Sequence, residues 1–427
     1  MANISNYKNR IADQLLERKL AGKGAVLIVG PKWCGKTTTA KRQAQSILDL
    51  SKKLTLEQSR QMMDIHPESL LSGETPRVID EWQLIPALWD IVRTEVDERN
   101  DFGQFILTGS AVLPEADETL HSGTGRIGRL KMRPMSLYES GESKGEVSLN
   151  DLFANADIPV ISHEMSIEQM AFLTCRGGWP QATFLQGDIA LDQAEDYLEA
   201  LLTSDMHRVD KVQRSSERMR YIMRSYARNQ GTQCPISMIR ADLLGSDNQQ
   251  ISDDTISSYL DILNRLFVVE DLPAWNPNLR SKGAIRTSAT RYFVDPSIAT
   301  SALGIVPKDL VNDLKTFGFL FETLAIRDLR VYADALKAKV YHFRDSNGLE
   351  CDAVIHRRDG SYGLCEIKLG GPNNIELGAN SLKAVANSID TDKMPAPSFL
   401  MVLTAIGPYA YRRKDGVFVV PIGCLRP

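Results

Sequence analysis

The sequence feature that most constrains the fold is a glycine-rich octapeptide between an apolar run and a helix-forming stretch. Residues 25–30 read AVLIVG and are typical of a buried strand, and residues 37–50 are typical of a helix. Between them, residues 30–37 read GPKWCGKT and satisfy the pattern G-x-x-x-x-G-K-[ST]. Strand, glycine loop and helix in this order predict a P-loop α/β domain whose loop wraps phosphate groups.

This loop supplies a set of phosphate ligands. Its backbone N–H groups and the start of the following helix attract phosphate oxygens, Lys36 reaches the terminal phosphates, and the Thr37 hydroxyl binds Mg²⁺. We therefore expect ATP and Mg²⁺ as the bound cofactors. The expected nucleotide-binding residues are Gly30, Pro31, Lys32, Trp33, Cys34, Gly35, Lys36, Thr37 and Thr38.

Two further apolar runs end in polar residues that complete such a site. The run VIDE predicts a strand whose end carries Asp80 as a Mg²⁺ ligand and Glu81 as the residue that positions or deprotonates the attacking water. The run FILTGS predicts a third strand, and Thr108 or Ser110 at its end is the expected γ-phosphate sensor. The alternative for these two hydroxyls is a simple strand cap or turn.

Two arginines beyond the third strand are candidates to complete the site. The segment GRIGR contains Arg126 and Arg129 beside a glycine-rich stretch. An arginine that reaches the γ-phosphate, from the same chain or from a neighbouring copy, stabilises the charge that develops during hydrolysis. The alternative is an ordinary exposed arginine, since most arginines lie on protein surfaces.

Five segments taken in order carry a resemblance to a known family. GPKWCGKT, RVIDEWQ, FILTGS, GRIGRLKMRPMSLYE and RGGWPQA resemble prokaryotic AAA-type ATPases that carry a C-terminal domain of unknown function. The resemblance covers nearly the whole chain. It implies an AAA-type sheet order, a tendency to oligomerise, and a role near the nucleotide for Arg126 and Arg129.

Composition restricts the partners and the compartment. The 427 residues carry a formal net charge of −4, so the whole molecule is not a polycation and any nucleic-acid site must be a local patch. No apolar run is long enough to span a membrane, and the polar N-terminus lacks the apolar core of a signal peptide. These features predict a cytoplasmic protein without a membrane partner. Its candidate partners are nucleotide, DNA and further copies of itself.

The order of elements predicts four parts of an α/β chain. Residues 1–140 are expected to form the AAA-type P-loop domain, residues 141–210 a helical bridge, residues 211–305 a winged helix, and residues 306–427 a restriction-endonuclease-like α/β domain. The winged helix is inferred from three helical stretches followed by two strand-like runs, FVVEDL and RYFVD. These runs flank a loop rich in proline, glycine and arginine.

Basic residues gather in two segments of the expected winged helix. Residues 207–228 hold seven arginines and lysines against two acidic residues, and residues 272–291 hold four basic residues and no acid. They are candidates for DNA phosphate contacts. The helix expected in the major groove, residues 252–266, is instead net acidic, so base-specific reading is not expected. The alternative is that this module packs on the ATPase domain or another subunit and its charges form a solvated face.

The last domain contains charged residues at hairpin spacing. Glu366 and Lys368 lie two residues apart on one expected strand and therefore share a face, beside Asp352 on the adjacent strand. Together with Glu322 on the preceding helix, they are similar to the PD-(D/E)XK nuclease motif, with Cys351 in place of the motif's proline. The similarity implies a second Mg²⁺ or Mn²⁺ held by carboxylates, with Lys368 orienting water. The alternative is a retained fold with a degenerate site.

These patterns predict a Mg²⁺-dependent ATPase that acts on DNA through a winged helix and a nuclease-like domain. Nucleotide state is expected to control DNA engagement through the helical bridge, which carries Gly177 and Gly178. Two alternatives stay open. One is a nucleotide-switched protein-interaction module with a non-catalytic C-terminal domain, and the other is a DNA-dependent ATPase without nuclease activity.

Overall fold

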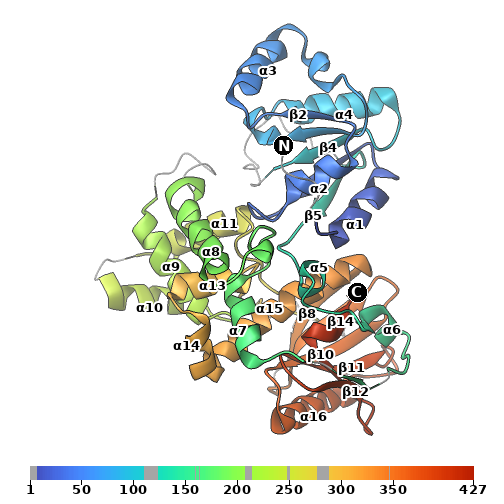
Figure 1. The fold of residues 1–427 in the computed structure, drawn as a ribbon, viewed down its shortest axis with the longest axis vertical. Helices are drawn as coiled ribbons and strands as arrows, with labels where there is room; N and C mark the ends of the chain where they lie inside the picture. The colour runs from blue at the N-terminus through green and yellow to red at the C-terminus, as the bar shows by residue number, and fades with distance from the viewer. Residues whose placement is uncertain are drawn as a thin grey trace. The chain divides into compact units, whose positions relative to one another are not determined.

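The computed structural model describes residues 7–109, 124–158, 160–162, 164–206, 214–247, 251–276, 288–345 and 347–427 (Figure 1). The chain divides into two compact units. Unit 1 comprises Met1–Pro134, Ser204–Gln213 and Ile262–Phe267, and unit 2 comprises Met135–Thr203, Arg214–Asp261 and Val268–Pro427. Each unit contains a sheet and helices, which confirms the α/β class predicted from the sequence.

A five-stranded parallel sheet forms the centre of unit 1, in the order β2-β3-β4-β1-β5. Its strands are β1 (Ala25–Val29), β2 (Ser46–Asp49), β3 (Arg77–Asp80), β4 (Phe105–Thr108) and β5 (Ile127–Lys131). The helical elements described here are α1 (Ile11–Leu20), α2 (Lys36–Gln43), α3 (Lys53–Ile65) and α4 (Leu88–Arg99), with 3-10 turns at Pro67–Leu71 and Trp82–Leu84. Because β4 lies between β1 and β3, the carboxyl ends of these three strands meet at one edge.

Alternating side chains form a separate core on each face of this sheet. One core packs strand residues against α1 and α2, and includes Val26, Ile28, Val78 and Ile106. The other packs strand residues against α4, and includes Leu27, Ile79 and Leu107. Strands covered on both faces read as continuous apolar runs, and this is why the sequence indicates them so clearly.

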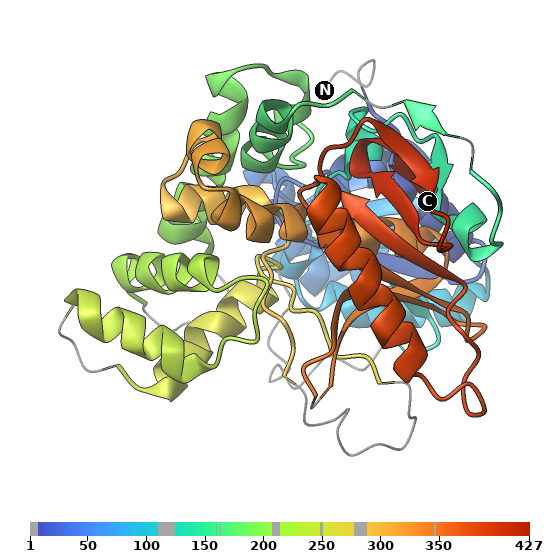
Figure 2. The same ribbon diagram turned by 90° about the horizontal axis from the view of Figure 1, so that it is seen from below.

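The sheet of unit 2 has seven strands in the order β7-β12-β13-β11-β10-β9-β8. Its strands are β7 (Ile161–Ser162), β8 (Ala338–Arg344), β9 (Glu350–Arg357), β10 (Tyr362–Lys368), β11 (Phe399–Thr404), β12 (Tyr409–Arg412) and β13 (Phe418–Pro421). Strands β8, β9 and β10 form an antiparallel meander, and α16 (Pro372–Ser388) leads from β10 to the parallel strand β11. Figure 2 shows α16 lying along this sheet, where it packs on β9, β10 and β11, while α15 (Leu314–Ala335) contacts β8, β9 and β10.

Helices dominate residues 137–312. They are α5 (Leu137–Ser140), α6 (Leu149–Phe153), α7 (Ile167–Arg176), α8 (Asp188–Ala200), α9 (Ser216–Arg228), α10 (Ile236–Asp247), α11 (Asp253–Arg265), α13 (Pro296–Leu303) and α14 (Pro307–Asn312). Smaller elements are a 3-10 turn at Ala182–Phe184, a π-helical turn at Leu201–Asp205, another 3-10 turn at Ile422–Cys424, and the paired strands β6 (Val147–Ser148) and β14 (Leu425–Arg426).

The expected winged helix has its three helices, α9, α10 and α11, where the sequence placed them. Its two strand-like runs pair through the isolated bridges Val269–Phe293 and Leu272–Thr290, not through a regular ladder. The loop residues 277–287 lie outside the described residues. The winged-helix assignment therefore stays a prediction.

A buried ionic cluster ties three distant segments of unit 2 together. Arg327 on α15 contacts Asp295 and Asp328, each at 2.8 Å, and all three side chains are almost fully buried. Asp295 also accepts the backbone N–H of Gly178, and Asp328 accepts the backbone N–H of Leu137, both at 2.9 Å. A Cβ atom at Gly178 would lie 2.1 Å from a carbonyl oxygen, so only glycine fits beside this cluster.

Removing the cation from this cluster is expected to be costly, because two carboxylates would stay buried without it. We expect Arg327→Leu to lower the free energy of unfolding of unit 2 by about 3–5 kcal/mol in urea titrations. The control is Arg220→Leu, which breaks the half-exposed ion pair with Glu199 at 2.8 Å. That variant should cost less than about 1 kcal/mol. Equal losses in the two variants would contradict a special role for the buried cluster.

The same cluster predicts a pH dependence of stability. Burial raises the pKa of Asp328 to about 6, although Arg327 opposes the effect. Between about pH 4 and pH 6 the folded chain then holds a proton that the unfolded chain releases, so the free energy of unfolding falls as pH rises through this range. Asp328→Asn should remove this component, by at most about 1.4 kcal/mol per pH unit. Parallel pH profiles of the two proteins in urea titrations would show the expectation to be wrong.

Candidate functional site

The glycine loop of unit 1 lies between a strand and a helix, as its sequence predicts, but the helix is shorter than expected: α2 ends at Gln43, and residues 46–49 of the expected helix form β2. Strand β1 ends at Val29 and α2 begins at Lys36. Gly30 and Gly35 adopt φ values of 151° and 99°, which residues with a Cβ atom rarely adopt. A Cβ at Gly30 would also lie 2.0 Å from the carbonyl oxygen of Met132. Both glycines are therefore required for the chain to turn this tightly into the helix.

Four polar side chains lie in or beside this loop: Lys36 and Thr37 at the start of α2, Asp80 at the end of β3 and Thr108 at the end of β4. The Lys36 ammonium is buried and donates to the carbonyl oxygens of Gly30 at 2.9 Å and Pro31 at 2.7 Å. One carboxylate oxygen of Asp80 accepts the Thr37 hydroxyl at 2.8 Å and the Thr108 hydroxyl at 2.5 Å. In the sheet, Thr108 of β4 pairs with Ile28 of β1 on one side and with Asp80 of β3 on the other. Hydroxyl and carboxylate oxygens are the ligands that Mg²⁺ prefers, so this donor set fits the ion.

Glu81 follows the acidic strand in a left-handed conformation, with a φ of 58°. Its carboxylate accepts a hydrogen bond from the Gln83 side-chain amide. The other amide atom of Gln83 lies 2.7 Å from the position that a Cβ at Gly109 would take. A positive φ at a residue other than glycine is uncommon and is often found at functional sites.

The remaining loop residues differ in exposure. Thr38 and Trp33 are exposed, and Trp33 has a φ of 64°. Cys34 is fully buried, and its Sγ lies 3.7 Å from the Met132 carbonyl oxygen. The Lys32 ammonium forms an ion pair with Asp205 at 2.7 Å.

The two candidate arginines do not reach the loop within this unit. Arg126 precedes β5 at the end where Ile127 pairs with Ala25, the first residue of β1. That end is roughly 13 Å from the loop, given the rise per strand residue. Arg126 instead contacts Asp97 at 2.5 Å, and Arg129 is exposed halfway along the edge strand β5. Ser110, the other sensor candidate, lies outside the described residues.

Arg10 is a residue of this site that the sequence analysis missed. Its buried guanidinium donates to the carbonyl oxygens of Cys34 and Arg133, both at 2.8 Å. Because a trans peptide is planar, fixing the Cys34 carbonyl directs the Gly35 N–H the opposite way, into the loop. Arg10 therefore positions one of the backbone donors. An arginine at the start of a polar helix carries no local signal of such a contact.

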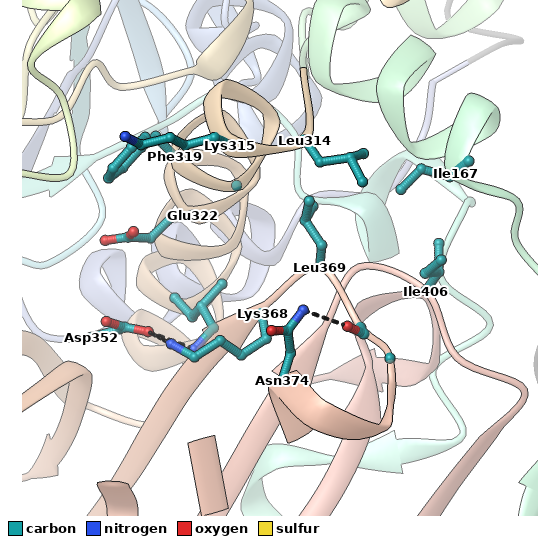
Figure 3. A pocket seen from close by; sticks show the side chains of 14 residues that line it. Ile167, Leu314, Lys315, Phe319, Glu322, Asp352, Lys368, Leu369, Asn374 and Ile406 are labelled. Atoms are coloured by element: carbon teal, nitrogen blue, oxygen red, sulfur yellow. Dashed lines mark hydrogen bonds and ion pairs between the residues drawn. The ribbon is translucent and has the colours of Figure 1, made fainter. Parts of the chain in front are cut away.

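The charged residues predicted in the last domain do converge. The Lys368 ammonium lies 2.6 Å from Glu366 and 3.2 Å from Asp352. Lys368 and Asp352 line a cleft of about 560 Å³, and Figure 3 shows Glu322 projecting from α15 on the same side as Asp352. The opposite wall is apolar and contains Ile167, Leu314, Leu369 and Ile406. Antiparallel pairing of β9 with β10 accounts for the convergence, since it sets these side chains on one face.

The electrostatics of this cleft are unusual. Burial, reinforced by the charge of Asp352, raises the pKa of both Glu322 and Glu366 to about 8. Burial opposes the positive charge of Lys368, but Asp352 and Glu366 outweigh it and raise the lysine pKa. Among the described residues, no group of three His, Cys, Asp or Glu side chains could hold a metal ion. The ammonium occupies the place between the carboxylates that a cation would take.

Tyr292 is a second residue that the sequence analysis missed. Its hydroxyl donates to Glu322 from a nearly fully buried ring. Its backbone carbonyl accepts the hydroxyl of Tyr226 on α9 at 3.3 Å. Tyr292 thus connects the run RYFVD directly to the cleft. Its role could not be read from the sequence because the two residues lie 30 positions apart.

The basic residues of the expected winged helix are largely paired within the chain. Arg220 contacts Glu199, Arg228 contacts Asp242 at 3.4 Å, and Arg291 contacts Asp271 at 3.0 Å. Arg224 is exposed on the same face of α9. Five further basic candidates, Arg208, Lys211, Arg280, Lys282 and Arg286, lie outside the described residues.

Three domain families match successive parts of the chain. Residues 22–141 match an AAA domain. Residues 167–309 match a domain of unknown function, DUF8612, and residues 317–425 match another, DUF4143. The AAA match coincides with the glycine loop and the acidic strand and supports the AAA-type P-loop domain predicted from the sequence for residues 1–140.

Two mycobacterial proteins are similar to nearly the whole chain, and two archaeal structures match it with low TM-scores. The uncharacterized proteins Mb2031c of Mycobacterium bovis and Rv2008c of Mycobacterium tuberculosis are each 22% identical, over 97% of this chain and 83% of theirs. Among solved structures, the Walker-type ATPase PABY2304 of Pyrococcus abyssi is 17% identical, with a TM-score of 0.44 over 70% of this chain and 96% of its own. The Hef helicase domain of Pyrococcus furiosus is 12% identical, with a TM-score of 0.19 over 94% of this chain and 90% of its own. None of the helices within the described residues has both the length and the apolar character needed to cross a membrane.

Proposed function

We propose that this protein binds ATP with Mg²⁺ at the glycine loop of unit 1 and hydrolyses it. The observation that carries the proposal is the buried carboxylate of Asp80, shared by the hydroxyls of Thr37 and Thr108. A buried carboxylate at the meeting point of three strand ends, next to a helix N-terminus and a lysine, is the arrangement that phosphoryl transfer requires.

Each residue has a distinct role in this proposal. The Lys36 ammonium exchanges its two backbone carbonyl partners for phosphate oxygens. Thr37 and Asp80 hold Mg²⁺, which when bound neutralises charge on the phosphate oxygens. Glu81 orients the attacking water, and Thr108, between the two motif strands, senses the γ-phosphate.

The two arginines fit this proposal only through oligomerisation. Arg126 and Arg129 lie away from the loop within unit 1, so an arginine contribution from either residue would come from a neighbouring copy. Such a contribution would make hydrolysis depend on protein concentration. The ATPase domain therefore accommodates, without requiring, the assembly that the family resemblance implies.

Two substitutions separate binding from hydrolysis. We expect Lys36→Ala to weaken ATP binding by about 10²-fold or more, because the buried positive charge is lost. Glu81→Gln should retain binding but lower the hydrolysis rate by about 10²- to 10⁴-fold, because the water is no longer oriented. Isothermal titration with ATP and a phosphate-release assay measure the two effects.

Lys23→Ala is the matched control for these variants. Lys23 contacts the Gly125 carbonyl oxygen at the opposite end of the sheet, so its removal should leave both measurements unchanged. An Lys36→Ala protein that binds and hydrolyses ATP like the wild type would overturn the proposal.

We propose phosphodiester cleavage in DNA as a second candidate function, located at the cleft of unit 2. The convergence of Asp352, Glu366 and Lys368 beside Glu322 favours it. Metal binding would require Lys368 to leave the carboxylates, so we assign no metal-dependent step to this arrangement. The basic residues of α9 and of the loop before Tyr292 are the proposed phosphate contacts.

Plasmid DNA tests this second candidate. We expect wild-type protein with ATP to nick plasmid DNA, and Lys368→Ala, which removes the cation of the cleft, to slow nicking by about 10²-fold or more. Lys383→Ala is the control. Lys383 lies toward the C-terminal end of α16 and forms a surface ion pair with Asp415. Absent nicking together with DNA-stimulated ATP hydrolysis would instead favour a DNA-dependent ATPase. Absent DNA binding at low salt would favour a nucleotide-switched protein-interaction module.

A further inference from the structure

An ion pair ties the glycine loop to a segment far away in the sequence. The Lys32 ammonium lies 2.7 Å from the carboxylate of Asp205, 173 positions later in the chain. The Asp205 side chain is only 11% exposed, whereas that of Lys32 is 36% exposed. A carboxylate so little exposed depends on its partner, since few water molecules reach it.

The position of Lys32 makes this pair sensitive to phosphate. Lys32 is the third residue of the octapeptide that the proposed function wraps around the phosphates of ATP. A bound triphosphate would bring several negative charges next to an ammonium that already contacts a carboxylate. Two anions then compete for one ammonium, and each weakens the other's contact by the same factor.

The segment that contains Asp205 is irregular in conformation. Helix α8 ends at Ala200 and continues as a single π-helical turn, Leu201–Asp205. Such turns are rare and are frequently found at functional sites. Leu202 within the turn and Met206 directly after it are fully buried, so the turn is a packed part of the structure. The division between the units falls within this turn, after Thr203.

We propose that Asp205 is a built-in competitor of nucleotide phosphate for Lys32, so that ATP binding releases Asp205 from the glycine loop. This inference rests on the proposed nucleotide site. In the absence of nucleotide Asp205 neutralises the loop lysine, and in its presence Lys32 contacts phosphate as a second lysine beside Lys36. The freed carboxylate then needs water, which requires the turn to open.

Nucleotide affinity gives the first test. We expect Asp205→Asn to bind the non-hydrolysable analogue AMP-PNP with Mg²⁺ about 3- to 10-fold more tightly than the wild type, because Lys32 no longer has to leave a carboxylate. Lys32→Gln should weaken binding, and adding Asp205→Asn to it should have no further effect. The matched control is Glu95→Gln, which removes a carboxylate charge from an ion pair of the same length, 2.7 Å, on α4.

Hydrogen exchange of the wild-type protein gives a second test that needs no variant. Backbone amides of residues 201–206 should exchange faster when AMP-PNP is bound, while amides of β1 should not. An Asp205→Asn protein with the affinity of the Glu95→Gln control, or unchanged exchange in residues 201–206, would overturn the inference while leaving the nucleotide site intact. Wild-type protein that fails to bind AMP-PNP would overturn both.

Discussion

The edge at which β1, β4 and β3 end is the constraint on which the proposed chemistry of unit 1 depends. Parallel strands in this order bring the glycine loop, Thr108 and Asp80 together although they are far apart in sequence. None of these groups is reactive alone. Their proximity lets one buried carboxylate align two hydroxyls next to a lysine, and it follows from strand order and register, not from any single side chain.

Residues that act through local spacing could be predicted, and residues that act across the fold could not. The octapeptide around Lys36 and the two-residue spacing of Glu366 and Lys368 carry their geometry in a few adjacent positions, so the sequence indicated both. Arg10 and Tyr292 make their contacts across long stretches of chain, and nothing beside them in the sequence reveals a partner. Arg126 lies at the far end of β5 from the glycine loop of its own unit, so its predicted role stays a prediction that depends on a neighbouring copy.

The two candidate sites handle charge in opposite ways. At the glycine loop, within the part of the chain that the structure describes, Lys36 donates to backbone carbonyls and not to a carboxylate, and it is available to an incoming anion. In the cleft of unit 2, Lys368 is already paired with Asp352 and Glu366, and burial raises the pKa of the Glu322 carboxyl beside them. The first site is prepared for a highly charged ligand. In the cleft of unit 2, Lys368 would have to leave Asp352 and Glu366 before it could contact a highly charged ligand.

The buried cluster around Arg327 has a consequence for how such chains arise. Leu137, Gly178 with Asp295, and Arg327 with Asp328 belong respectively to the AAA match, to the DUF8612 match and to the DUF4143 match. A recombination event that replaced the segment of Arg327 with a foreign sequence would leave the carboxylate of Asp295 buried without its cation. Selection should therefore transmit the three segments as a single heritable block, in contrast to domains joined by a flexible linker, which shuffle freely between genes.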